Sequence, residues 1–178
     1  MKVKNIGLHL LQNMNLTEQQ LKFVQTWGTL GTNWGINKTM AQLHALLMIS
    51  EDALSTEEMM ETLKISRGNT NMNVRALVEW GLANKEMIAG DRRDFYSAKK
   101  DIWVVARQIA HQRRKRELEP VIAALVELKR DTPVDAEHKQ LINRVNDIED
   151  FAIKIDRMLE KFEKSDENWF YKVLLKLV

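Results

Sequence analysis

Residues 55–98 read STEEMMETLKISRGNTNMNVRALVEWGLANKEMIAGDRRDFYSA, and their order of caps and breaks is the strongest structural signal in the chain. Ser55 opens a capping box, which predicts a short helix that ends near Leu63. Ser66 is a second N-cap, and the helix after it is expected to end at Trp80, directly before a glycine. Two helices joined by a tight turn are therefore expected at the front of this segment.

The period of the apolar residues changes after this pair of helices. Residues 82–88 and 94–98 have the character of two short strands, and residues 89–92 have turn composition. Further helices are expected upstream, over about 17–35, where Thr17 opens a capping box, and over about 37–50. Helices followed by a hairpin predict a mainly α fold, a winged helix-turn-helix with a two-stranded β-wing.

The remaining sequence predicts long helices. Asp101 is the expected cap of a helix that runs towards Arg130, with Pro120 as a kink or break. A second helix is expected after Pro133, and it carries apolar residues spaced alternately by four and three, as in a coiled coil. This predicted dimerisation seam consists of Leu141, Val145, Ile148, Ala152, Ile155, Leu159 and Phe162.

The resulting organisation has two domains. Residues 1–100 are predicted to form an N-terminal helix and the winged head, and residues 101–178 a helical dimerisation region. Residues 165–178 are amphipathic and are expected to dock as a short helix.

Composition excludes several classes of function. The 178 residues include no cysteine, and the four histidines lack metal-ligand spacing, so no metal site, catalytic site or cofactor is expected. No apolar run reaches the length of a membrane span, and a cytoplasmic protein without a membrane partner is expected. The net charge of +2 excludes a uniformly basic coat.

The helix over 66–80 is the candidate recognition helix. Thr70, Val74 and Leu77 form its core stripe, and the opposite face is rich in amides and arginine. Asn can pair with adenine through two hydrogen bonds, and Arg with guanine or a phosphate, so this face suits the major groove of DNA. The residues of this helix predicted to contact double-stranded DNA are Ser66, Arg67, Gly68, Asn69, Asn71, Met72 and Arg75.

Arg92 and Arg93 lie at the tip of the predicted hairpin. Their place predicts contact with the adjacent minor groove or its phosphates. Local ion pairs with Asp91 or Asp94 are the alternative interpretation.

Several of these segments together resemble the GbsR-type branch of the MarR family. The resemblance rests on Ser66-Arg67-Gly68, on Trp80-Gly81-Leu82, on the segment from Gly90 to Tyr96, and on the run from Arg113 to Pro120. It implies a homodimeric transcriptional regulator, typically a repressor. The two-fold axis of such a dimer predicts a pseudo-palindromic operator. The resemblance also implies a candidate small-molecule effector, because members of this branch are associated with choline or betaine sensing.

Three features have two interpretations each. Quaternary ammonium ions bind in aromatic cages, and the candidates to line one are Trp27, Trp34, Trp103 and Tyr96; core packing is the alternative. The basic run 113–116 either touches flanking phosphate or pairs with Glu117 and Glu119, and the second interpretation is favoured. For the whole chain, the alternative to a DNA-binding regulator is a winged-helix protein-interaction module assembled by the coiled coil.

Overall fold

The computed structural model of the protein describes residues 16–165, and the chain divides after Lys100 into two compact units. The amphipathic helix predicted over 165–178 lies, apart from its first residue, outside the described residues. The first unit contains α1 (Glu18–Asn33), α2 (Lys38–Ile49), β1 (Leu54–Ser55), α3 (Thr56–Leu63), α4 (Arg67–Glu79), β2 (Ala83–Met87) and β3 (Asp94–Ala98). The second contains α5 (Ile102–Arg113), the π-helix η1 (Arg114–Leu118), α6 (Glu119–Asp131) and α7 (Lys139–Lys164).

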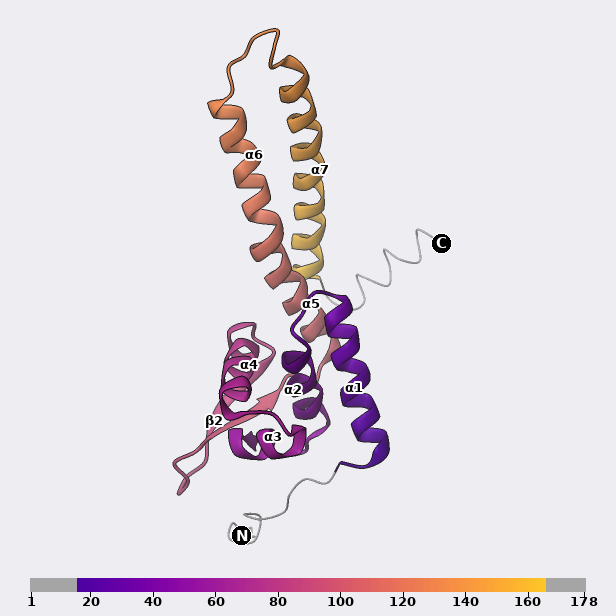
Figure 1. The fold of residues 1–178 in the computed structure, drawn as a ribbon, viewed down its shortest axis with the longest axis vertical. Coiled ribbons are helices and arrows are strands. Elements are labelled where there is room, and N and C mark those ends of the chain that lie inside the picture. Colours follow the sequence, from indigo (N-terminus) through magenta and orange to yellow (C-terminus); the bar gives the residue numbers. More distant parts are fainter. Residues whose placement is uncertain (1–15, 166–178) are drawn as a thin grey trace. The chain divides into compact units, whose positions relative to one another are not determined.

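Helix α2 is the centre of the first unit. It packs against α1 and α4 (Figure 1), and Leu43, Leu46 and Leu47 are almost completely buried. Each such side chain contributes about 1.5–3 kcal/mol to folding. Met59 of α3 completes this core. The helix-turn-helix therefore packs on the core around α2, and α4 contacts this core through its inner face.

The predicted caps are confirmed. Thr17 and Ser55 each form a capping box with the residue three positions on, and Ser66 accepts a hydrogen bond from the backbone amide of Asn69. Between α3 and α4 the chain turns at Lys64, whose φ of 55° is left-handed. Gly81 has a φ of 70° and follows α4, as the sequence predicts.

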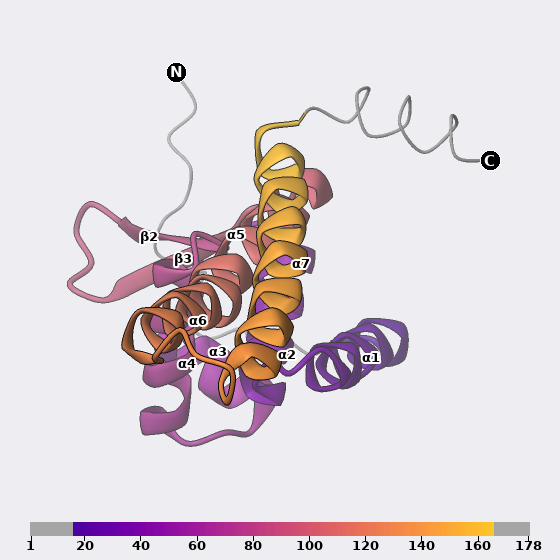
Figure 2. The same cartoon turned by 90° about the horizontal axis from the view of Figure 1, so that it is seen from above.

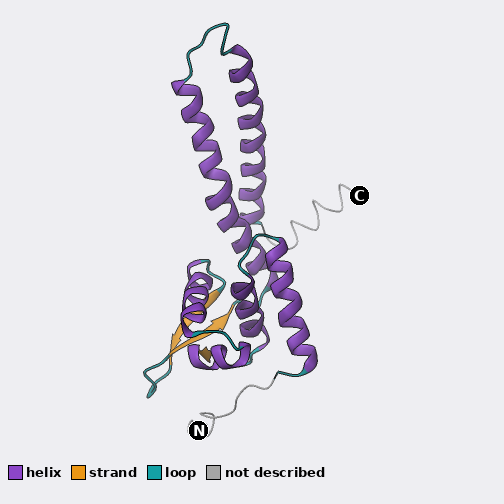
Figure 3. Ribbon diagram, viewed as in Figure 1, coloured by secondary structure: helices purple, strands orange, loops and turns teal. Residues whose placement is uncertain are grey.

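The sheet has three antiparallel strands in the order β1-β3-β2. Strands β2 and β3 form the expected wing hairpin, coloured orange in Figure 3, and Met87 pairs with Asp94 at its outer end. Strand β1 is not predicted by the sequence; its two residues pair with Phe95 and Tyr96. This pairing joins the start of α3 to strand β3 of the wing, so the wing and the helix-turn-helix belong to one packed unit.

Helices α6 and α7 form an antiparallel hairpin, seen from above in Figure 2. Lys129 and Glu149 form an ion pair between their inner faces. The predicted seam does not lie on one free face of α7, because Val145 and Ala152 are buried while Leu141 and Ile148 are exposed. The chain's own hairpin therefore covers part of the predicted seam.

Among residues 16–165, no helix combines the length and the apolar character needed to cross a membrane.

Candidate nucleic-acid interface

Helix α4 is fixed from one side only. Its predicted core stripe, Thr70, Val74 and Leu77, is completely buried, and the Thr70 hydroxyl donates to the backbone oxygen of Ser66 at 3.0 Å. The other side of the helix exposes Met72, which leaves 62% of its surface accessible. Met72 therefore contributes little to the core of the first unit.

Gly68 lies at the start of this outward face. A Cβ built on it meets no atom within 4 Å, and its backbone is not left-handed. Glycine costs a helix up to about 1 kcal/mol relative to alanine, so nothing within the described chain favours glycine here. The absence of a side chain does permit close approach of another molecule to the amides at the N-terminus of α4, where the helix dipole favours an anion.

Arg75 stands two turns further along the same face. Its side chain is exposed, and it has no hydrogen bond or ion pair with another described residue. Lys85 of β2 lies near enough for the two positive charges to interact, although Lys85 also forms an ion pair of 2.8 Å with Asp94. That hydrogen bond raises the pKa of Lys85, so Lys85 stays charged. The sequence pattern does not indicate that Arg75 of α4 and Lys85 of the wing lie close together.

The three asparagines of α4 do not share one role. Asn73 is buried, and its amide donates to the backbone oxygen of Asn69 at 2.8 Å and to its side-chain oxygen at 2.7 Å. Asn69 in turn donates to the hydroxyl of Thr39 on α2 at 3.4 Å. Asn69 is thus engaged in holding α4 to α2. Asn71 is half-buried, and it has no such bond to another described residue.

Arg67 also has a partner in the protein. Its guanidinium lies 3.0 Å from Glu57 of α3, and both side chains are substantially exposed. Exposed pairs of this kind contribute little to stability, so a phosphate can replace the carboxylate at small cost.

The two wing arginines differ. Arg93 forms an ion pair with Asp91, donating at 2.7 and 3.1 Å, and it lies over the Phe95 ring, 5.1 Å from its centroid. The hydrogen bonds from Arg93 lower the pKa of Asp91 to about 2, so this carboxylate stays ionised. Arg92 is exposed, without an ion pair to any described side chain. The alternative interpretation of the sequence gave Arg92 a local ion pair, but in the structure the pair with Asp91 belongs to Arg93.

The aromatic residues singled out from the sequence have separate surroundings. The Trp27 ring stacks with the Phe23 ring, with 5.8 Å between their centroids, and its centroid lies 6.2 Å from that of the His44 ring. Trp34 is half-exposed. Tyr96 is buried in the sheet. Trp103 belongs to the second unit, where its ring meets Phe162.

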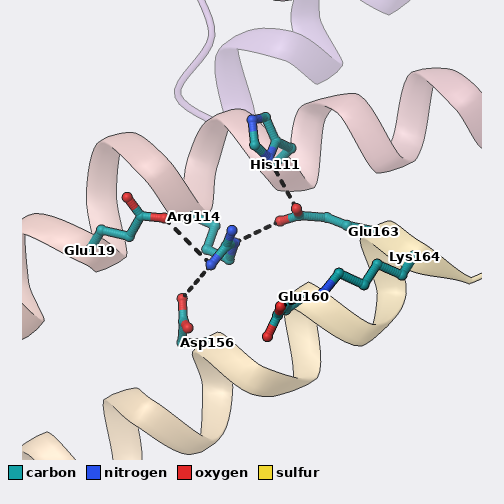
Figure 4. Close-up of polar contacts among 7 residues, drawn as sticks. All are labelled: His111, Arg114, Glu119, Asp156, Glu160, Glu163 and Lys164. Carbon is teal, nitrogen blue, oxygen red and sulfur yellow. Dashed lines mark hydrogen bonds and ion pairs between the residues drawn. The ribbon is translucent and has the colours of Figure 1, made fainter.

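The basic run in the second unit is largely engaged with acids. Arg113 pairs with Glu117 at 3.2 Å, and Arg114 pairs with Glu119 at 3.4 Å. Figure 4 shows that Arg114 also reaches across to α7, where Asp156 and Glu163 lie 3.1 and 2.9 Å away. The favoured interpretation, in which these arginines pair with Glu117 and Glu119, is confirmed for Arg113 and Arg114. The structure adds that Arg114 joins η1 to α7.

This architecture defines a winged helix-turn-helix protein. Residues 34–94, the segment that holds the helix-turn-helix and the wing, match the model of the MarR family. A solved structure, described as the crystal structure of a transcriptional regulator, is similar with a TM-score of 0.64. That alignment covers 82% of this chain and 96% of the other at 18% identity, so it supports the fold. No curated protein matches the sequence.

Proposed function

We propose that this protein is a sequence-specific, double-stranded DNA-binding transcriptional regulator, acting as a homodimeric repressor on a pseudo-palindromic operator. The observation that carries the proposal is the outward face of α4. Its open glycine and its unpaired arginine have no role within the described protein, and both fit a DNA groove. The family match over residues 34–94 supports the same conclusion.

Base reading is assigned to Asn71 and Arg75. Both lie on α4 without a partner among the described residues, and their side chains can pair with adenine and guanine edges. Asn69 was also predicted from the sequence to contact DNA. Its side chain donates a hydrogen bond to Thr39 of α2, which must break before Asn69 can reach a base. Asn69 is therefore proposed to support the helix from behind.

Phosphate contacts are assigned to the start of α4 and to the wing. The first backbone amides of α4, at Arg67 and Gly68, lie at the positive end of the helix dipole, whereas the amide of Asn69 already donates to the Ser66 side chain. Arg67 can exchange Glu57 for a phosphate, and Arg92 can reach the neighbouring groove. Because Arg93 is held by Asp91, Arg92 is the wing arginine proposed to contact phosphate, where the sequence suggested both.

The charge balance predicts a moderate dependence on salt. Residues 39–98 carry six basic and nine acidic residues, and several of the cations are already paired. Few counterions are then released on binding, and each winged head is expected to contribute about three to four units to the magnitude of the slope of log affinity against log salt, about one for each phosphate contact.

The test begins with selection of bound sites from random duplex DNA by the full chain. An Asn71→Ala variant is then expected to lose about 1–3 kcal/mol of binding at the selected site and to relax the preference at one base step. Equal affinity for selected and random duplexes, together with binding that ignores salt, would instead favour the protein-interaction module.

A further inference from the structure

Two large apolar side chains lie exposed at the tip of the wing. Met87, the last residue of β2, leaves 90% of its surface accessible, and Ile88 after it leaves 39%. Met87 is the most exposed large apolar residue described in the first unit. The loop between β2 and β3, teal in Figure 3, projects away from the helices of this unit, as Figure 2 also shows. The fold of the first unit therefore makes almost no use of the Met87 side chain.

The turn at the tip is shaped by its own hydrogen bonds. The backbone amide of Asp91 donates to the backbone oxygen of Ile88 at 3.0 Å and closes a four-residue turn. Gly90, the third residue of this turn, has a φ of 86°, which a type II turn requires at that position. The Asp91 carboxylate also accepts a hydrogen bond from the backbone amide of Arg93 at 2.9 Å. The backbone next to Met87 is therefore held in a defined shape.

Cations flank Met87 along the hairpin. Side chains two residues apart on a strand lie on the same face, so Met87 shares a face of the wing with Lys85. The charge of Lys85 interacts with that of Arg75 on α4. Asp94, the acid opposite Met87, pairs with Lys85 at 2.8 Å. On the other side of the turn, Arg92 is exposed and has no ion pair with a described side chain. The apolar tip is therefore continuous with the surface that is proposed to contact DNA.

We propose that the wing inserts Met87 between two base pairs of the neighbouring minor groove, and that the protein thereby selects a base step that unstacks easily. Apolar side chains inserted from the minor groove partially unstack a base step and kink the duplex. Pyrimidine–purine steps unstack most readily, so one is preferred at the wing position without any hydrogen bond to its bases. The inference rests on the proposed function, to which it adds a second source of sequence preference besides α4.

The chemistry of methionine suits insertion and does not suit contact with phosphate. The Met87 side chain has no charge and no hydrogen-bond donor, so it has nothing to offer a phosphate oxygen. Its unbranched chain and polarisable sulfur adapt to irregular apolar gaps. Transfer of this side chain from water to the space between two bases removes apolar surface from water, which favours the bound state. Arg92, on the same loop, is placed to hold the phosphates beside the opened step.

The first test detects unstacking directly. In the selected duplex, 2-aminopurine replaces one adenine at a time, because its fluorescence rises when the base loses its stacked neighbours. Binding of the full wild-type chain is expected to raise the signal at one step in each half-site. Met87→Ser should remove the rise, whereas Met87→Leu, which keeps a large apolar side chain, should retain it. Val134→Ser is the matched control, because Val134 precedes α7 in the second unit, is 92% exposed and should not affect the signal.

The second test measures how Met87 and the base step depend on each other. Replacing the unstacked step by a stiff A-tract step is expected to weaken wild-type binding about tenfold, as a mismatched base pair typically does. Met87→Ser should bind the two duplexes with affinities within about twofold of each other, because the side chain that senses the step is gone. Its slope of log affinity against log salt should equal that of wild type, because no phosphate contact is lost.

The outcomes separate the insertion from the function on which it rests. Binding of the selected duplex without unstacking overturns the insertion and leaves the proposed function standing, as does unstacking that persists in Met87→Ser. Failure to select any DNA site overturns both, and the exposed wing tip then fits a protein partner. Met87→Ser should melt at the wild-type temperature, since the side chain is 90% exposed. Loss of unstacking in this variant therefore reports on insertion and not on folding.

Discussion

Helices α1 and α4 both contain glycine, and the two sites differ in what surrounds them. In α1, a Cβ on Gly28 would meet Gln42 Cγ at 2.6 Å, and one on Gly31 would meet Ala41 Cβ at 2.5 Å. In α4, a Cβ on Gly68 meets nothing within 4 Å. The α1 glycines are explained by close packing against α2, whereas no contact among the described residues explains the glycine of α4.

The same difference extends to the neighbouring side chains. Around α1 and α2 the residues serve the fold: His44 is buried against Trp27, and no described residue satisfies its Nε2 atom. Around α4 and the wing, Arg75 and Arg92 project outward without partners among the described residues. Changes in the first region should therefore affect stability, and changes in the second should affect binding.

The largest effect is expected from acidification of the inner region. Burial lowers the pKa of His44 from 6.5 to about 4. Between these values the unfolded chain binds more protons than the folded one, so the free energy of unfolding falls as the pH drops through this window. The contribution of His44 is on the order of 3 kcal/mol at the acid end.

Denaturant unfolding of wild type and His44→Leu between pH 7 and pH 4 measures this effect. The variant should lose stability less steeply with falling pH, whatever its stability at pH 7. Parallel curves for the two proteins would show that His44 is not buried as described.

The next effect concerns the contact between α1 and α2. Gly31→Val places branched carbon where Ala41 already lies, and such overpacking typically costs about 1–3 kcal/mol. Thermal unfolding followed by circular dichroism should show a lower melting temperature. Gly90→Val is not a suitable control, because Gly90 has a φ of 86° and is strained by any side chain.

A smaller effect separates the two wing arginines. Arg92→Ala should lower the slope of log affinity against log salt by about one unit for each bound head, and so by about two for the homodimer, because each head loses one phosphate contact. Arg93→Ala removes a side chain that is held by Asp91 and Phe95, so it should change the slope less. Fluorescence anisotropy across several salt concentrations distinguishes them, and equal slopes for both variants and wild type would remove the wing from the interface.

Local signals allowed much of the fold to be predicted. Thr17, Ser55 and Ser66 cap the helices that the sequence indicates, and the core stripe of α4 is as expected. Strand β1 could not be predicted, because two residues form no periodic pattern and their partners lie some forty residues later.

The site was less predictable, because its details depend on contacts that are distant in sequence. The engagement of Asn69 depends on Thr39 of α2. Which wing arginine pairs with Asp91 depends on the direction of the hairpin backbone. The heptad spacing of α7 indicates that a helix packs along it, but the pattern does not distinguish a helix of the same chain from one of a second copy. The structure shows that α6 takes one side of α7 and leaves Ile148 and Phe151 on the other.

The central claim is that the outward face of α4 is shaped for DNA, and Gly68→Ala tests it most directly. Alanine fits the open space and is the better helix former, so the free energy of unfolding should rise by a few tenths to about 1 kcal/mol. The variant should therefore melt at a slightly higher temperature. The measurement is its affinity for the selected duplex at fixed salt, compared with that of wild type. We predict that binding weakens about tenfold or more although the protein becomes more stable. Unchanged or tighter binding by the stabilised variant would contradict the claim.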